Sequence, residues 1–137
     1  MKAGLILVTI VAVLLAVWML RRSGERPINT SDMPDDPDGQ VLRQLVLAGS
    51  DLSKPHDAEF FLYFPDEERA SKACRELTAE GYTGKVERAA QGPSWLCFVT
   101  KQIIPSHGVM VAIRKRMSEL ARAGGGEYDG WGAPVMR

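Results

Sequence analysis

The sequence predicts an α+β fold: a ferredoxin-like βαββαβ sandwich with an extra leading helix, preceded by one transmembrane helix. Three observations support this prediction. Residues 3–20 carry no charged side chain. In residues 38–137, segments with apolar side chains at helical spacing alternate with segments rich in aromatic and β-branched residues. After the first helix these segments follow the order β-α-β-β-α-β, which is typical of two helices packed on one face of an antiparallel sheet.

The N-terminal segment predicts a membrane anchor. Residues 3–20 are apolar except for one threonine, and as a helix they would measure roughly 27 Å, enough to cross the hydrocarbon core of a bilayer. The apolar run is longer than that of a signal peptide, and no small-residue cleavage site follows it. Arg21 and Arg22 end the segment, and the basic residues on this side favour a cytoplasmic domain. We therefore expect residues 1–22 to anchor the protein in a bacterial inner membrane.

The remaining chain divides into a linker and one acidic domain. Residues 23–37 contain three prolines and few apolar side chains, which predicts a flexible linker before a domain at 38–137. Of the 17 basic and 17 acidic side chains, residues 1–26 hold four and one, which leaves 13 and 16 for the rest. A net acidic domain is untypical of proteins that bind a phosphate backbone, so no direct nucleic acid binding is expected.

The first half of the domain predicts a helix, a strand and a second helix. Asp38 is expected to cap the leading helix, which would end at Gly49 and bury Val41, Leu42, Leu45 and Val46. Residues 58–64 are rich in aromatic side chains and predict a strand that Pro65 ends. Pro65 and three acidic residues suit the first turn of the second helix, whose apolar face would consist of Ala70, Ala73, Cys74 and Leu77.

The second half predicts two strands, a helix and a last strand. Residues 82–89 and 95–104 are the expected strands, with a turn between them. Ser106 can cap the next helix, and the three glycines at 124–126 are expected to end it, since glycine readily adopts a left-handed turn. A short last strand is expected at 127–131.

The residues that could carry chemistry form no recognisable constellation. Cys74 and Cys97 could form a disulfide or remain reduced in the core, and their apolar surroundings favour buried, reduced side chains. His56 and His107 have no companion at metal-ligand spacing and are interpreted as capping or surface residues. The basic residues 114–116 are interpreted as a solvated helix face rather than an RNA site. We expect no catalytic residue, no metal and no cofactor.

One segment near the C-terminus combines two large aromatic rings with two acids. It consists of Glu127, Tyr128, Asp129, Gly130 and Trp131. Tyrosine and tryptophan are frequent at binding hot spots, because they bury a large area and keep a polar tip for hydrogen bonding. The rings could equally cover the end of the sheet as part of the core, and both interpretations remain open. The acids are expected at the surface.

Two segments resemble motifs of a known family. The sequence GGEYDGW at 125–131 resembles the closing motif of the RraB family, whose members regulate ribonuclease E. Gly49, Ser50 and Asp51, at the end of the leading helix, resemble the family's GSD turn. The expected strands and helices also follow the family's order, so the resemblance covers about residues 38–133.

The resemblance implies a function and a binding surface. Members of the family are not catalysts; they bind ribonuclease E, restrain its cleavage of transcripts and so modulate RNA decay. The implied partner-binding residues are Asp51, Glu127, Tyr128, Asp129 and Trp131. An acidic domain suits a partner with basic segments. The alternative hypothesis is a membrane-tethered adaptor or immunity-type module that binds a partner other than ribonuclease E. A third hypothesis is a small hydrolase or metal-binding domain, for which a thermal shift screen would be a test.

Overall fold

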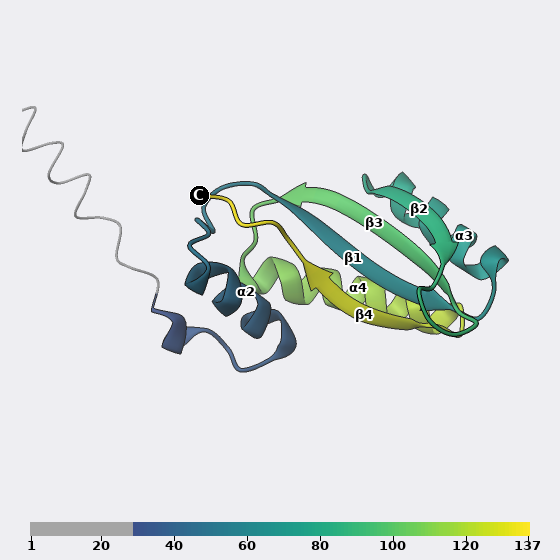
Figure 1. Cartoon of the computed structure of the whole chain (residues 1–137), viewed down its shortest axis with the longest axis horizontal. Coiled ribbons are helices and arrows are strands. Elements are labelled where there is room, and N and C mark those ends of the chain that lie inside the picture. The colour runs from purple at the N-terminus through teal and green to yellow at the C-terminus, as the bar shows by residue number, and fades with distance from the viewer. Residues whose placement is uncertain (1–28) are drawn as a thin grey trace, which may run out of the picture.

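A four-stranded antiparallel sheet forms the centre of the molecule (Figure 1). The computed structural model describes residues 29–137. Their elements, in chain order, are η1 (Thr30–Asp32), α2 (Pro37–Leu47), β1 (His56–Phe64), α3 (Glu67–Ala79), β2 (Thr83–Arg88), β3 (Trp95–Ile103), α4 (His107–Ala123) and β4 (Glu127–Gly132). The strands lie in the order β2-β3-β1-β4, and every neighbouring pair is antiparallel. The order β-α-β-β-α-β after a leading helix is therefore present in the described chain.

The predicted fold class was wrong in its first element, the transmembrane helix. Residues 3–20, which were expected to span the bilayer, lie outside the described residues. Within residues 29–137 none of the helices is both long enough and apolar enough to cross a membrane. α3 and α4 instead each bury one apolar stripe and carry charged side chains on their other faces, and α2 buries Asp38 beside Leu42 and Leu45. The fold class is corrected to an α+β domain with one antiparallel sheet and three α-helices, and the expected inner-membrane localisation is withdrawn.

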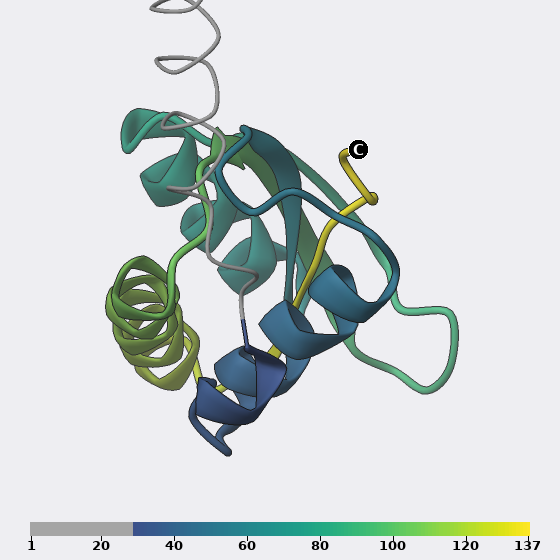
Figure 2. The same cartoon turned by 90° about the vertical axis from the view of Figure 1, so that its left-hand side faces the viewer.

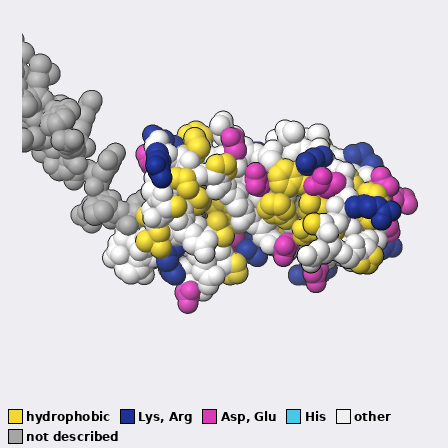
Figure 3. All heavy atoms as spheres, viewed as in Figure 1, with side chains coloured by type: hydrophobic (Ala, Val, Ile, Leu, Met, Phe, Trp, Pro, Cys, Tyr) yellow, Lys and Arg dark blue, Asp and Glu magenta, His cyan; other side chains and the backbone are white. Residues whose placement is uncertain are grey.

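Two helices cover one face of the sheet. α3 packs behind β2 and β3, and α4 packs behind β1 and β4 (Figures 1 and 2). α2 lies beside α4 and β4 at one edge. The opposite face of the sheet carries no helix of the described chain, and its side chains form the surface seen in Figure 3.

The core lies between the sheet and the helices α3 and α4. Alternate residues of β1, from His56 to Phe64, are buried against these helices. The helices contribute Leu77, Met110 and Met117, each of which is almost fully buried. Burial of these apolar side chains is the main favourable contribution to the free energy of folding of a small domain. The central strand β1 therefore has its position set by packing on both neighbouring strands and both helices.

Local rules explain where the helices begin. Ser106 caps α4 as predicted, and Asp66 caps α3, since each side chain accepts a hydrogen bond from the amide three residues on. Pro65 and Asp66 therefore precede α3, and the prediction that they belong to its first turn was wrong. The predicted cap of α2 was wrong by two residues. Asp36, not Asp38, accepts from the Gly39 amide at 2.7 Å. Pro37 at the first helical position explains this start, because proline has no amide that would go unpaired.

The three glycines after α4 have a second role besides ending the helix. α4 ends at Ala123, and Gly125 has φ +67°, as the terminator interpretation requires. A Cβ on Gly126 would lie 2.0 Å from the carbonyl oxygen of Tyr63, and one on Gly124 would lie 2.7 Å from the Phe64 ring. The turn between α4 and β4 is therefore closely packed on the end of β1.

The two cysteines are core residues. Cys74 comes from α3 and Cys97 from β3; both are buried and free, as expected, and their sulfurs lie 3.0 Å apart. The hydrogen bond with Cys74, together with burial, raises the pKa of Cys97. Part of the predicted linker also contacts the domain, because Arg43 donates to the carbonyl oxygens of Thr30 and Met33 at 3.2 and 3.0 Å.

Candidate protein-binding site

The EYDGW segment forms the edge strand β4, and a bulge directs both of its rings to the same side. Trp131 is opposite Phe60 and Tyr128 is opposite Leu62, so two residues of β4 stand opposite Phe61. One of these two is Gly130, whose φ of +101° is a conformation that favours glycine. The bulge turns both rings toward the helices. The structure therefore decides the open question in favour of the core.

Trp131 is anchored by a buried carboxylate. The indole is 7% exposed, and its Nε1 donates a hydrogen bond of 3.2 Å to Oδ1 of Asp38 on α2. Asp38 is 1% exposed and also accepts from Nε and Nη2 of Arg114, at 2.8 and 3.0 Å. This paired geometry is typical of strong arginine–carboxylate contacts. The cluster of Asp38, Arg114 and Trp131, here called the buried triad, joins α2, α4 and β4.

The interpretation of residues 114–116 as a solvated face was wrong for Arg114. Its hydrogen bonds to Asp38 raise the pKa of the guanidinium, so the charge is held firmly. Arg116 binds Glu80 at 2.8 Å and lies 3.7 Å from Glu76, both of which are on or next to α3. Lys115 is exposed and the Arg116 side chain is 42% exposed, so these two residues fit the interpretation as a solvated face. Sequence spacing could not reveal these partners, since they lie on other elements.

Tyr128 is half-buried beside the triad. The Arg114 guanidinium lies 5.4 Å from the centre of its ring, within the range of a cation–π contact. Its hydroxyl oxygen is buried and has no hydrogen-bond partner among residues 29–137. Burial raises the pKa of Tyr128, because the charged phenolate would lose its hydration.

The acids of the motif are exposed, as expected. Glu127 and Asp129 both point away from the core on the edge strand. Asp129 also borders a hollow of about 330 Å³ between α2 and β4. The hollow is lined by Pro37, Gln40, Val41, Gln44, Arg114, Tyr128, Asp129, Gly130 and Trp131. A partner that contacts this edge would meet two carboxylates, side-chain amides and the polar edge of a strand.

Asp51 lies at the other end of the sheet from Glu127. It precedes β1, whereas Glu127 stands opposite Tyr63 near the end of β1. The Asp51 carboxylate accepts from the hydroxyl and amide of Ser53 at 2.6 and 3.0 Å, and these bonds lower its pKa. The Asp51 amide donates to the carbonyl of Met136 at 2.6 Å. The structure thus does not bring the five predicted residues together in one cluster.

The GSD motif holds a buried histidine in place. His56 is 0% exposed, so its interpretation as a surface or capping residue was wrong. Its Nδ1 donates to the carbonyl of Lys54 at 2.7 Å, which leaves Nε2 to accept from the Ser50 hydroxyl at 2.6 Å. Ser50 also accepts from the Met136 amide at 2.9 Å. The motif therefore ties the loop before β1 to the C-terminal segment.

His107 is the first residue of α4, and its partly exposed side chain contacts the cap of another helix. Its Nε2 lies 2.7 Å from Oδ2 of Asp36, the cap of α2. The Gly39 amide and His107 lower the pKa of Asp36. Within residues 29–137, no three histidine, cysteine or acidic side chains are grouped closely enough to hold a metal ion.

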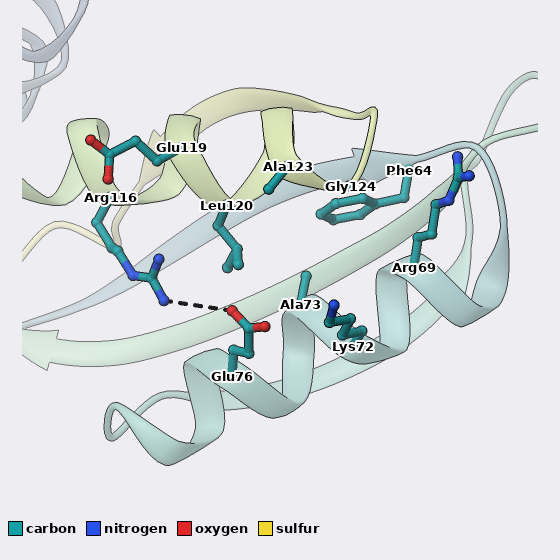
Figure 4. Close-up of a pocket in the computed structure, with 10 residues that line it drawn as sticks. All are labelled: Phe64, Arg69, Lys72, Ala73, Glu76, Arg116, Glu119, Leu120, Ala123 and Gly124. Atoms are coloured by element: carbon teal, nitrogen blue, oxygen red, sulfur yellow. Dashed lines mark ion pairs between the residues drawn. The ribbon is translucent and has the colours of Figure 1, made fainter.

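A second hollow, between α3 and α4, was not anticipated from the sequence. It measures about 430 Å³ and is lined by Phe64, Arg69, Lys72, Ala73, Glu76, Arg116, Glu119, Leu120, Ala123 and Gly124 (Figure 4). Leu120 and the Phe64 ring point into it from α4 and the end of β1. The Glu76–Arg116 ion pair closes one side. The hollow was not predicted, because charged residues on two separate helices give no indication in the sequence that they lie opposite each other.

The domain that contains this site matches one known protein family. A family model described as "Regulator of ribonuclease activity B" matches residues 35–133, which include α2, the whole sheet and both motif segments. A search of curated proteins found no match. The family match covers most of the chain and confirms the resemblance seen in GSD and EYDGW. The chain belongs to the RraB family, the regulators of ribonuclease activity B.

Proposed function

We propose that this protein binds ribonuclease E and inhibits its cleavage of RNA, as a regulator that is not itself a catalyst. Membership of the RraB family is the observation that carries the proposal, because the match extends over the folded domain rather than a single motif. The choice of ribonuclease E, and of inhibition as the effect, comes from the likeness of the GSD and EYDGW segments to those of the family.

The edge formed by β4 and α2 is the proposed binding surface. Trp131 and Tyr128 face inward, so they hold the edge in position and would meet the partner only where they line the hollow between α2 and β4. The contacts would come from Glu127, Asp129 and the hollow between α2 and β4. An edge strand also offers unpaired backbone groups that a partner segment can bind. Asp51, on its separate loop, would form a second contact.

Exposed acids support a basic segment as the part of ribonuclease E that binds. Carboxylates on a rigid strand steer a positively charged partner and select its orientation more than they add to affinity. Such contacts weaken as salt is added, because exposed charges are screened over about 10 Å at 0.1 M ionic strength. The proposal therefore requires inhibition that is sensitive to salt.

The test is an RNA cleavage assay with ribonuclease E from the same organism and increasing amounts of the full chain. We expect a dose-dependent loss of cleavage that the double variant Glu127→Gln, Asp129→Asn weakens. Glu68→Gln, on the exposed start of α3, is the matched control and should inhibit like the unaltered protein. Unchanged cleavage at saturating protein, with no complex on size-exclusion chromatography, would refute the proposal. Trp131→Ala is unsuitable here, since it removes a buried side chain.

A further inference from the structure

The face of the sheet opposite α3 and α4 carries a strip of apolar side chains on its two central strands. Because residues of a strand alternate between faces, Phe61 and Tyr63 of β1 point away from the core. Their partners on β3 are Phe98 and Leu96. The rings of Phe61 and Phe98 lie 5.3 Å apart, centre to centre. Leu96 is buried although it lies outside the core cluster, which shows how closely this strip packs.

Carboxylates surround the strip. Asp57 and Glu59 of β1, Glu87 of β2 and Glu127 of β4 lie on this face by the same alternation and register. The one basic side chain that β2 adds to this face is Lys85. In Figure 3 hydrophobic side chains gather over the strands, and both acidic and basic side chains lie at their border. The four carboxylates outnumber the ammonium group, so this face is acidic as well as aromatic.

The acidic border argues against a nucleic acid as the occupant. Some four-stranded sheets stack bases of RNA on aromatic side chains of their central strands, and Phe61 and Phe98 occupy comparable positions. A phosphate backbone on this sheet, however, would meet Glu59, Glu87 and Glu127. Proteins that bind nucleic acids neutralise phosphates with lysine and arginine instead.

Arginine side chains fit both features of this face. A planar guanidinium stacks on aromatic rings and donates paired hydrogen bonds to carboxylates. The face already contains a small version of this contact, since Nζ of Lys85 lies 5.5 Å from the centre of the Phe98 ring and 3.7 Å from Glu87. Neighbouring aliphatic or aromatic residues of a partner would cover the apolar strip.

We propose that the open face of the sheet, which we call the aromatic face and define by Phe61, Tyr63, Leu96 and Phe98 with their acidic border, binds an arginine-containing apolar segment of a protein partner. This surface is separate from the hollow between α2 and β4, and it shares only Glu127 with the edge described above. The proposal is independent of the identity of the ribonuclease, because it concerns the chemistry of the segment that this face accepts.

Fluorescence anisotropy with the full chain and a labelled peptide of alternating arginine and leucine tests the proposal. We expect saturable binding that added salt weakens. Phe98→Ser should weaken it by at least about fivefold, as expected for a side chain at the centre of an interface. Glu87→Gln should weaken it by about twofold, as expected for an exposed ion pair. Glu68→Gln, on α3 behind the sheet, should leave it unchanged.

Two further probes make the result decisive. The same peptide with glutamate in place of arginine, and a single-stranded RNA of similar length, should both fail to bind. Binding of the RNA as tightly as the arginine peptide would overturn the proposal, and so would peptide binding that Phe98→Ser and Glu87→Gln leave unchanged. If Phe98→Ser loses its native circular dichroism, Glu59→Gln combined with Glu87→Gln decides the outcome, because these changes at the border of the strip keep the size of both side chains and leave its packing intact.

Discussion

Arg114 on α4 donates two hydrogen bonds, of 2.8 and 3.0 Å, to the carboxylate of Asp38 on α2, a side chain that is 1% exposed. A carboxylate removed from water needs such partners, because an unpaired buried charge is very costly. Trp131 of β4 is the third member of this group. The contacts of Asp38 with Arg114 and Trp131 therefore hold the proposed binding edge, which β4 and α2 form, in position.

Replacement of Arg114 tests how much the contact between Arg114 and Asp38 contributes to the stability of the fold. Arg114→Met keeps the packing of the stem and removes the charge, so Asp38 would stay buried with only the Trp131 indole as a partner. We expect the free energy of unfolding to fall by about 2–3 kcal/mol, less than for a fully buried pair because the Arg114 side chain is 31% exposed. Urea denaturation measures the change. Lys115→Met, at the exposed neighbour, is the control and should stay within about 0.5 kcal/mol; equal losses in the two variants would contradict the expectation.

Two replacements of Trp131 separate its hydrogen bond from its volume. Trp131→Phe keeps a buried ring and removes the donor to Asp38, so a loss of about 1 kcal/mol is expected. Trp131→Ala also leaves a cavity, and the expected loss is about 3–5 kcal/mol. Thermal or urea unfolding of both variants gives the comparison. Similar small losses for both would mean that the indole contributes little to the core, against its exposure of 7%.

The buried hydroxyl of Tyr128 leads to two predictions about stability, one for the removal of this hydroxyl and one for alkaline pH. Its oxygen is buried without a partner in the described part of the chain, so Tyr128→Phe should leave the free energy of unfolding at pH 7 unchanged or raise it by up to about 1 kcal/mol. Burial raises the pKa of Tyr128 above the ordinary value of 10. The neutral form is therefore favoured in the folded state, and this stabilisation is complete below pH 10 and is lost as the pH rises toward the raised folded value.

Tyr128→Phe should consequently lose less stability than the unaltered protein above pH 10. Urea denaturation at pH 8, 10 and 11 measures the difference between the two slopes. Part of the alkaline loss should remain in the variant, because burial also raises the pKa of Tyr82. Parallel slopes for the two proteins would show that the Tyr128 hydroxyl reaches water in the folded state.

A pair of glycine substitutions tests the close packing of the turn after α4. Gly126→Ala would place a Cβ 2.0 Å from the Tyr63 carbonyl oxygen, so β4 would have to shift, and a loss of about 1–3 kcal/mol is expected. Gly108→Ala, near the start of α4, meets nothing within 4 Å and should raise stability by up to about 1 kcal/mol. Melting temperatures of the two variants should therefore move in opposite directions.

Local sequence patterns predicted the elements well where neighbours in the chain decide them. The cap Ser106, the Pro65 that follows β1 and the glycines after α4 act within one turn, so their effects can be read without the fold. The strand predicted at 127–131 is present as Glu127–Gly132. The cap of α2 was missed, because Asp36 and Asp38 are equally suitable by type and only Pro37 between them favours the first.

Contacts between distant parts of the chain could not be predicted in the same way. His56 was misjudged because its partners depend on how the GSD loop folds back and on where the C-terminal segment lies. Arg114 was misjudged because Asp38 lies 76 residues away in the sequence. Charged side chains are usually solvated, and nothing local distinguishes one that pairs with a buried carboxylate.

The sequence by itself determined the order of helices and strands, the buried face of α3 and the family to which the motifs belong, because periodicity and capping are properties of short segments. Only the tertiary structure decided that Tyr128 and Trp131 face inward while Glu127 and Asp129 remain exposed, and that Asp51 lies apart from them. The physical reason is the bulge at Asp129 and Gly130, which shifts the strand register by one residue and so sets the direction of every side chain in β4.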